Sequence, residues 1–343
     1  MAPVTIGIDL AKSVFQVHGV DAHGRPVLRR RLSRGRVLGF FADLPPCRIG
    51  MEACSSAHHW ARQLEELGHD VRLMAPQYAK PYVKRNKTDA ADAEAICEAV
   101  ARPNMRFVPI KTVDQQAVLA LHRARALLVR QRTQLANAIR GLLGEFGIIA
   151  PNGIRRLTEL RERAAGTEED ALPNEARAAV SLLFRQLDET QDRIGAVEAD
   201  ILTWHAHSET SQRLATAPGI GPITATALVA AVGDARQFDS ARRFAAWLGL
   251  TPRVTASGGR EKLGKITKAG DRYLRTLLIH GARALIGALR RRSALPRPWL
   301  LELVGRRPVN VAATALAHKT ARAVWAMLTR QEPWRVPVRT AAA

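Results

Sequence analysis

Cysteine, aromatic residues and long apolar runs are all scarce in this chain of 343 residues. Its three cysteines, Cys47, Cys54 and Cys97, are odd in number and lack metal-ligand spacing, which argues against a disulfide framework or a zinc site and is typical of a reducing cytosol. With only 5% aromatic residues, recognition of a partner by ring stacking is a weak prospect. No apolar run approaches the ~20 residues of a spanning helix, and no signal peptide is evident. We therefore expect a cytoplasmic protein that does not insert into a membrane.

Acidic residues are also few compared with basic ones. The chain has 31 Asp and Glu against 52 Lys and Arg, a formal net charge of +21 and a pI near 11.2. Such an excess predicts a polyanionic partner, either nucleic acid or an anionic membrane surface. The lack of membrane segments favours nucleic acid, held mainly through Arg and Lys contacts to phosphate. The length allows two domains and a substantial core.

The first hundred residues have the pattern of a mixed α/β unit. Apolar runs, polar-apolar alternation in the first hairpin and turn residues predict strands at 4–10, 14–20, 26–32, 47–52 and 70–74. Helices are expected at about 35–43, 56–67 and 88–101. This order, βββαβαβα, is that of the ribonuclease H-like (RuvC-type) fold. In that fold the first strand, the fourth strand and the last helix bring their acidic residues to one edge of the sheet.

Four acidic residues fall on those three elements. Asp9 lies in the first strand and Glu52 ends the fourth, where a buried charge is costly unless it is paired or bound to a metal. Asp89 and Asp92 share one face of the helix that Thr88 is expected to cap. Two carboxylates from strands and two from one helix turn are the oxygen ligands with which a pair of divalent cations holds a phosphodiester. The four are therefore candidate metal ligands.

After residue 104 the sequence becomes helical. Leucines at helical spacing predict long helices over 112–146 and 174–207, and the polar segment 153–173 between them is interpreted as a loop or hairpin tip. Two long amphipathic helices in succession indicate an antiparallel coiled-coil arm. The arm either packs only on itself or contacts another subunit or nucleic acid, and the pattern leaves both possibilities open.

A mainly helical unit is expected from residue 211. Gly219 and Gly221 lie in a turn between helical segments, typical of a helix-hairpin-helix in which backbone amides approach a phosphate. An ordinary tight turn between helices is the alternative. The expected elements that follow are helices at 223–232, 239–247, 268–290 and 308–329, with a Gly-rich loop at 249–264 and a tail at 331–343.

A serine beside two glycines lies in that Gly-rich loop. Ser257 precedes Gly258 and Gly259, so its hydroxyl would be unobstructed, and nearby cations could neutralise a phosphoryl-transfer transition state. The basic residues expected to contact nucleic acid are Arg260, Lys262, Lys265, Lys268, Arg272 and Arg275. Composition alone favours a plainer interpretation, a solvated serine in a flexible loop whose basic neighbours only bind the DNA backbone.

Several motifs together identify a family resemblance. They are Gly7-Ile8-Asp9-Leu10-Ala11-Lys12, Met51-Glu52-Ala53-Cys54, Lys87-Thr88-Asp89-Ala90-Ala91-Asp92-Ala93, Pro218-Gly219-Ile220-Gly221-Pro222, Gly249-Leu250-Thr251-Pro252, Ser257-Gly258-Gly259 and Ile266-Thr267-Lys268-Ala269-Gly270-Asp271. In this order they resemble the insertion-sequence transposases of the IS-one-ten type, including its IS-eleven-eleven subgroup, from residue 4 to about 329. That family joins an N-terminal RuvC-like DEDD domain to a C-terminal transposase domain through a coiled coil. The implied domains are 1–104, 105–210 and 211–330.

The resemblance also implies a chemistry and a set of partners. Asp9, Glu52, Asp89 and Asp92 would bind Mg²⁺, and Ser257 would be the nucleophile that forms a phosphoserine link to DNA. The implied partners are donor DNA, target DNA and a structured bridge RNA encoded by the element, which guides recombination. A tetrad in one domain and a nucleophile in another fits an active site shared between the subunits of a tetramer associated with the nucleoid.

Two other functions remain to be weighed against a recombinase. In a RuvC-like junction nuclease the same carboxylates would activate water, and Ser257→Ala would be tolerated. A non-enzymatic nucleic-acid-binding protein would explain the charge of +21 but not the convergence of carboxylates, which repel one another without a metal. Covalent storage of the bond energy needs no ATP, and the sequence has no Walker-type loop, so no nucleotide cofactor is expected.

Overall fold

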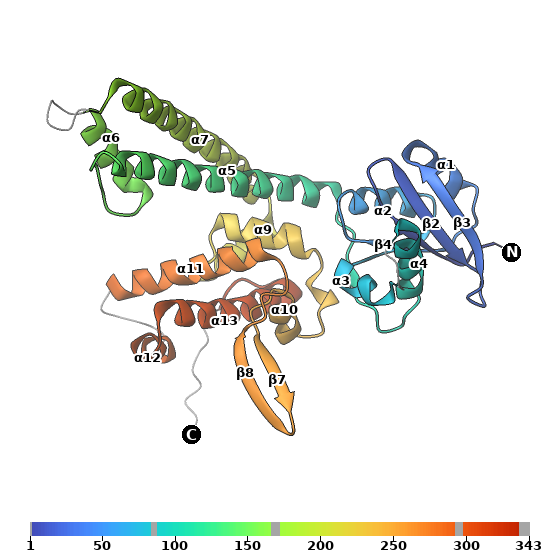
Figure 1. Cartoon of the computed structure of the whole chain (residues 1–343). Coiled ribbons are helices and arrows are strands. Elements are labelled where there is room, and N and C mark those ends of the chain that lie inside the picture. The colour runs from blue at the N-terminus through green and yellow to red at the C-terminus, as the bar shows by residue number, and fades with distance from the viewer. Residues whose placement is uncertain (1, 84–87, 166–171, 292–297, 336–343) are drawn as a thin grey trace, which may run out of the picture. The chain divides into compact units, whose positions relative to one another are not determined.

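The computed structural model describes residues 2–83, 88–165, 172–291 and 298–335. The chain divides into two compact units, Met1–Thr112 and Val113–Ala343, each with its own core (Figure 1). The expected arm and transposase domain thus fall in one compact unit. The middle of the expected polar tip, 166–171, and the end of the expected tail, 336–343, lie outside the described residues.

A six-stranded mixed sheet forms the centre of the first unit, in the order β3-β2-β1-β4-β5-β6. Its strands are β1 (Thr5–Asp9), β2 (Val14–Val20), β3 (Pro26–Ser33), β4 (Arg48–Glu52), β5 (Asp70–Met74) and β6 (Phe107–Val108). The first three form an antiparallel meander, and β1, β4 and β5 are parallel. The five strands expected from the sequence are confirmed, whereas β6, which has only two residues and pairs antiparallel with β5, was missed.

Helices cover both faces of this sheet. The helices α1 (Val37–Ala42) and α2 (Ala57–Glu66) contribute to the core on the face of Ile6 and Ile8. On the other face lies α4 (Asp89–Val100), preceded along the chain by the short α3 (Pro76–Ala79). The Thr88 hydroxyl accepts a hydrogen bond from the Ala91 amide at 3.2 Å, which confirms the expected N-cap of α4.

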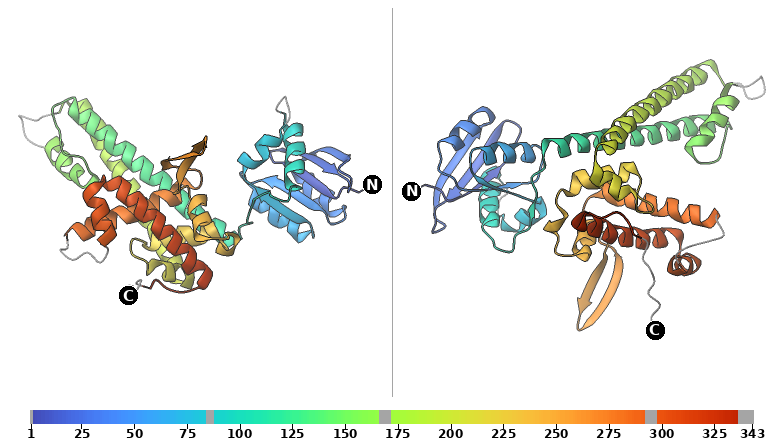
Figure 2. Two further views of the ribbon diagram at one scale, coloured as in Figure 1. Left: turned by 90° about the horizontal axis from the view of Figure 1, so that it is seen from below. Right: turned by 180° about the vertical axis from the view of Figure 1, so that it is seen from behind.

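Two long helices begin the second unit. The helices α5 (Val113–Gly144) and α7 (Asn174–Ala206) run back along each other, as Figures 1 and 2 show. Arg125 pairs with Glu198 and Arg132 with Gln191 across them, which gives an antiparallel alignment.

A short helix, α6 (Leu157–Ala165), packs at the end of this pair. The expectation of a loop over these nine residues was wrong. Leu157, Leu160 and Ala164 are buried against both long helices, and the charged residues between them concealed this apolar face.

The remaining helices pack into one alanine-rich core. They are α8 (Glu209–Ala215), α9 (Pro222–Val232), α10 (Ala241–Trp247), α11 (Arg272–Arg291), α12 (Pro298–Arg306) and α13 (Val309–Arg330). Small side chains such as Ala225, Ala227, Ala313 and Ala317 are fully buried. They allow the helices of this core to approach one another closely.

The segment expected to be a Gly-rich loop is instead a β-hairpin. Its strands, β7 (Pro252–Ser257) and β8 (Arg260–Ile266), are exposed along almost their whole length and project from the helices of their unit (Figure 1). Gly258 and Gly259 have φ angles of 57° and 74°, as a two-residue hairpin turn requires. The expectation was wrong because neither strand has a buried face. The segment therefore lacks the alternation of apolar and polar residues from which strands are predicted.

A buried histidine connects three helices of the second unit. His122 of α5 is 1% exposed, and its Nδ1 and Nε2 each lie 3.0 Å from a hydroxyl, of Tyr273 in α11 and Thr226 in α9 respectively. Thr226 donates its own proton to the Pro222 carbonyl at 2.9 Å. Its oxygen therefore accepts from Nε2–H, and Nδ1 accepts from Tyr273. Burial, with a smaller contribution from Arg125, lowers the pKa of His122 to about 4.

This histidine should make the stability of the second unit sensitive to acid. The unfolded chain protonates His122 near its ordinary pKa of 6.5, whereas the folded chain does so only near 4, so stability falls as pH falls between these values. The shift corresponds to about 3 kcal/mol of unfolding free energy. We expect His122→Gln to remove this part of the pH dependence in denaturant titrations at pH 7 and pH 4. The exposed His23→Gln should leave it intact, and equal pH dependence in both variants would contradict the assignment.

Candidate functional site

Two glycines bring α4 against the sheet. A side chain at Gly7 would overlap the backbone of Ala93 and Cys97, and a Cβ at Gly50 would lie 2.7 Å from the Cβ of Val100. Gly7 and Gly50 are partners in the parallel pairing of β1 and β4. Because side chains alternate along a strand, the residues two positions further on lie on the same face as these glycines.

Those residues are Asp9 and Glu52, and they end neighbouring strands. The first turn of α4 supplies Asp89 and Asp92 at the same edge. The ligand oxygens of Asp9, Asp89 and Asp92 lie within 4.8 Å of one another, with Asp9 and Asp92 half-buried and Asp89 exposed. Glu52 is not in this group of three, although its strand ends beside that of Asp9. We call the three aspartates the acidic cluster.

The pKa of a neighbouring thiol, Cys54, shows the effect of the carboxylates at this edge. Burial raises the pKa of Cys54, and the carboxylates of Glu52 and then Asp9 raise it further. Both carboxylates are therefore close enough to disfavour a thiolate at Cys54. The negative field of Glu52 and Asp9 thus reaches a common point.

The donor set of the acidic cluster suits a hard divalent cation. Carboxylate oxygens are the ligands that Mg²⁺, Mn²⁺ and Ca²⁺ prefer, and no cysteine or histidine belongs to the group of three. Three like charges at this separation also destabilise one another unless a cation or protons offset them. The residues present therefore fit a divalent metal ion.

The close approach at Gly7 gives a testable dependence of the cluster on backbone packing. We expect Gly7→Ala to lower the unfolding free energy by about 1–3 kcal/mol, because α4 must move away from the added methyl group. The shift of α4 should also weaken Mg²⁺ binding, measured as the rise in melting temperature on adding Mg²⁺. Gly39→Ala is the matched control, since a Cβ there meets no atom within 4 Å. A Gly7→Ala variant as stable and as metal-responsive as the wild type would refute this account.

Ser257 lies at the tip of the β7–β8 hairpin. It is exposed, and its register partner is Arg260 across the two-glycine turn. Five of the six basic residues expected to contact nucleic acid are exposed on or after this hairpin: Arg260, Lys262, Lys265, Lys268 and Arg272. The hydroxyl is thus accessible and surrounded by cations along the chain.

Two glycines attach the base of the hairpin to α10. A Cβ at Gly249 would lie 2.6 Å from the Ala269 amide nitrogen, and one at Gly270 would overlap the Trp247 carbonyl oxygen. The Lys268 amide also donates to the Gly249 carbonyl at 3.1 Å. These contacts explain why glycine occurs at both positions of the motif.

Arg275 differs from the other basic candidates. Its side chain is 8% exposed, and its guanidinium donates to the Leu248 carbonyl at 3.1 Å and the Gly270 carbonyl at 3.3 Å. The positive charge is therefore used inside the fold, to hold the start of α11 to the end of α10. This placement does not support Arg275 as a nucleic-acid contact.

The turn with Gly219 and Gly221 also has a packing role. Gly219 has a φ angle of 85°, and a Cβ at Gly281 of α11 would overlap its carbonyl oxygen. Gly221 is the N-cap of α9, with Pro222 in the first turn. The close approach of Gly219 and Gly281 accounts for one glycine of the motif without any ligand. Contact with phosphate at this turn stays a prediction.

The sequence analysis missed Gly7, Gly50 and Gly281 as determinants of these sites. A glycine within an apolar strand, two residues before an acid, is the signal that could have pointed to the first two. No helix within the described ranges is long and apolar enough to cross a membrane.

Two family models match this chain. A family model described as "Transposase IS116/IS110/IS902 family" matches residues 211–295, and a DEDD transposase model of the IS110 type matches residues 6–148. The chain is 53% identical over 331 residues to a probable family 20 transposase of Pseudomonas aeruginosa, with 96% of this chain and 98% of the relative covered. The mixed α/β first unit fits the DEDD domain.

Two further relatives are named for insertion sequences. The transposase for insertion sequence element IS1111A of Coxiella burnetii is 42% identical over 330 residues, covering 96% of this chain and 91% of the relative. The transposase for insertion sequence element IS1328 of Yersinia enterocolitica is 42% identical over 325 residues, covering 95% and 96%. The chain therefore belongs to the IS116/IS110/IS902 family of insertion-sequence transposases, enzymes that cut and rejoin DNA.

Proposed function

We propose that this transposase cuts and rejoins DNA through a phosphoserine intermediate at Ser257, assisted by Mg²⁺ at Asp9, Glu52, Asp89 and Asp92. The observation that carries the proposal is the convergence of three of these carboxylates to within 4.8 Å, from β1 and from the first turn of α4. The match to a DEDD transposase domain supports dependence on a divalent metal.

Regular secondary structure fixes the positions of the acidic residues. Asp9 is fixed by the ladder of β1, and Asp92 is fixed by the first turn of a capped helix that packs on Gly7. A divalent cation bound there would polarise the scissile phosphate and offset its charge. Glu52, at the end of β4, completes the proposed set from the neighbouring strand.

Ser257 would carry the covalent step. Its Oγ attacks the phosphorus, a serine–phosphate bond forms, and the bond from phosphorus to one sugar oxygen breaks. The proton lost by the serine is taken up, through solvent, by that sugar oxygen, which becomes a free hydroxyl at the DNA end. A hydroxyl of another strand then reverses the step, so the number of phosphoester bonds is unchanged and no ATP is needed.

The basic residues that follow Ser257 would balance charge during this transfer. Arg260 faces Ser257 across the turn, and Lys262 and Lys265 continue along β8. All three are exposed, so their cations can approach phosphate oxygens. Lys268 and Arg272 extend the same positive charge toward α11.

We further propose that the active form is a homotetramer at the nucleoid, with donor DNA, target DNA and a bridge RNA as partners. The motif resemblance and the net charge of +21 support these partners. The long antiparallel pair α5 and α7 is a candidate for contacts with a second subunit or with RNA.

A trapping experiment tests the mechanism. The purified chain is incubated with Mg²⁺, RNA transcribed from the flanks of the element and end-labelled donor DNA, and the products are resolved on a denaturing gel. A protein–DNA adduct that peptide mapping assigns to Ser257 is the expected result. Cleavage without an adduct, retained in Ser257→Ala and lost in Asp9→Asn, would instead identify a hydrolytic, RuvC-like junction nuclease. That nuclease is the runner-up function, because the acidic cluster could equally activate water.

A further inference from the structure

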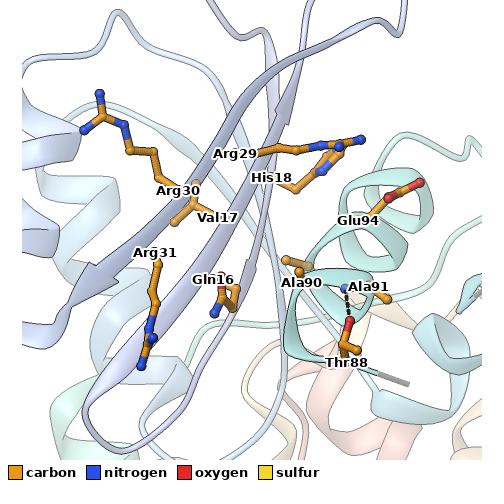
Figure 3. Close-up of a pocket in the computed structure, with 11 residues that line it drawn as sticks. Gln16, Val17, His18, Arg29, Arg30, Arg31, Thr88, Ala90, Ala91 and Glu94 are labelled. Carbon is orange, nitrogen blue, oxygen red and sulfur yellow. Dashed lines mark hydrogen bonds between the residues drawn. The ribbon is translucent and has the colours of Figure 1, made fainter. Parts of the chain in front are cut away.

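A groove of about 580 Å³ lies beside the acidic cluster, between the meander and the first turns of α4. Its lining comes from β2, β3 and α4: Gln16, Val17, His18, Arg29, Arg30, Arg31, Thr88, Ala90, Ala91, Ala93 and Glu94 (Figure 3). No tryptophan, tyrosine or phenylalanine is among them. The walls therefore offer cations and hydrogen-bonding groups but no platform for stacking a base.

The strand register places this groove next to the acidic cluster. Asp9 is paired with Gln16, and Gln16 with Arg31, so these three residues form one row across the sheet. The next row on the same face runs from Gly7 through His18 to Arg29. Because α4 packs on Gly7, both rows are on the side of the sheet that carries α4.

The groove has a strong positive edge. Arg29 and Arg31 are exposed on β3, the edge strand of the sheet, and within the described parts of the chain their side chains make no ion pair or hydrogen bond. Figure 3 shows Arg29 beside His18, on the side of the groove where Glu94 of α4 lies. Among the described residues of the lining, Glu94 is the single acid, against three arginines.

We propose that this groove binds the sugar-phosphate backbone of the DNA strand next to the phosphate that is cut. The inference rests on the proposed function, because it takes the acidic cluster as the place of cleavage. Arginine is suited to the role, since its planar guanidinium donates two parallel hydrogen bonds to a phosphate. Arg29 and Arg31 lie two positions apart on one strand face, about 7 Å, which a nucleic-acid strand follows in one or two nucleotides.

The chemistry of the walls decides which part of the strand is recognised. Among the described residues of the groove the one aromatic ring is the imidazole of His18, which is only 6% exposed, so the groove contacts phosphate and sugar and reads no sequence directly. Its position beside the acidic cluster selects the strand that is cut, which is DNA, over a guide RNA. Arginines on an edge strand also discourage sheet-to-sheet aggregation, but that role does not require them to face α4.

The test compares two double variants of the full chain. Arg29→Ala/Arg31→Ala removes the two arginines of the groove that lie on the side of the sheet that carries α4. Arg25→Ala/Arg36→Ala removes two exposed cations next to β3 that do not line the groove. Binding of fluorescein-labelled single-stranded donor DNA is followed by anisotropy in EDTA, so that no cleavage occurs, over a range of salt concentrations.

We expect the groove variant to bind at least about tenfold more weakly than the wild type. The slope of log K against log salt should fall by about 1.4, because two phosphate contacts to a single strand are lost. The control should change the slope by less than half as much. Arg29→Lys/Arg31→Lys should restore the slope, since the charge returns. If the alanine pair fails to fold, Arg29→Gln/Arg31→Gln removes the same two charges and should show the same loss.

Three outcomes would overturn the inference. They are unchanged binding in the groove variant, equal losses in groove and control variants, or a loss confined to RNA transcribed from the element's flanks. The proposed function has its own test, which is whether the wild type forms the adduct at Ser257. If the wild type forms that adduct while groove and control variants bind alike, the groove alone is refuted. If the groove variant loses DNA binding while the wild type forms no adduct, the phosphoserine mechanism alone fails.

Discussion

Asp9→Asn should abolish both DNA cleavage and the stabilisation of the protein by Mg²⁺. The substitution keeps the shape of the side chain and removes the charge of the one cluster residue that comes from the sheet. With Mg²⁺ at about 100 times its dissociation constant, the wild type should gain about 2.7 kcal/mol of unfolding free energy, and the variant almost none. Cleavage should fall by about 1000-fold or more, because the metal contributes several kcal/mol to the transition state. Calorimetry with and without Mg²⁺ measures the first effect, and gel assays measure the second.

Asp43→Asn provides the matched control for this measurement. Asp43 is an exposed acid of the same unit at the C-terminal end of α1, outside the acidic cluster. It should retain the Mg²⁺-dependent rise in melting temperature. If the wild type shows no such rise at millimolar Mg²⁺, or if Asp9→Asn retains it, the acidic cluster is not the metal site.

Ser257→Ala should eliminate the protein–DNA adduct and lower strand transfer by at least about 1000-fold, as expected when the nucleophile of a covalent mechanism is lost. The residue is exposed at a hairpin turn, so stability should change by no more than about 0.5 kcal/mol. The Mg²⁺-dependent stabilisation should also persist, because Ser257 does not belong to the acidic cluster. Peptide mapping of the trapped complex and melting curves provide the two measurements.

Thr255→Ala separates the chemistry of Ser257 from the presence of a hydroxyl on the hairpin. Thr255 is exposed on the same strand, two residues before Ser257 and hence on the same face. Its substitution should leave the adduct and strand transfer intact. An adduct that survives in Ser257→Ala would assign the nucleophile elsewhere and remove the central step of the proposed mechanism.

Most of the first unit could be predicted because its elements have strong local patterns. The strands β1 and β4 are short runs with three consecutive buried residues, β2 and β3 flank a turn that contains Gly24, and α4 begins with a capping threonine followed by two aspartates at helical spacing. The pairing of distant segments has no such local signal. The aspartates of α4 reach Asp9 because Gly7 and Gly50 let that helix touch the sheet, a three-dimensional condition that neither glycine reveals by itself.

The second unit was harder to predict, for physical reasons that differ from site to site. The hairpin at 252–266 buries almost nothing, so its strands lack the apolar face on which strand prediction depends. Arg275 was predicted to contact nucleic acid because of its charge, but its buried guanidinium donates to the Leu248 carbonyl at the end of α10. His122 shows the converse, a polar residue whose hydroxyl partners are 104 and 151 residues away in the chain.

The β7–β8 hairpin is anchored only at its base, and its strands are exposed along almost their whole length. From Pro252 to Ser257 it extends for about 17 Å at ~3.3 Å per residue, so a rotation of roughly 10° at the base moves the tip by about 3 Å. A misplacement of 1 Å can lower a catalytic rate about 100-fold. The position of the Ser257 hydroxyl therefore depends on how closely Gly249 and Gly270 pack against their neighbours, at the opposite end of the hairpin.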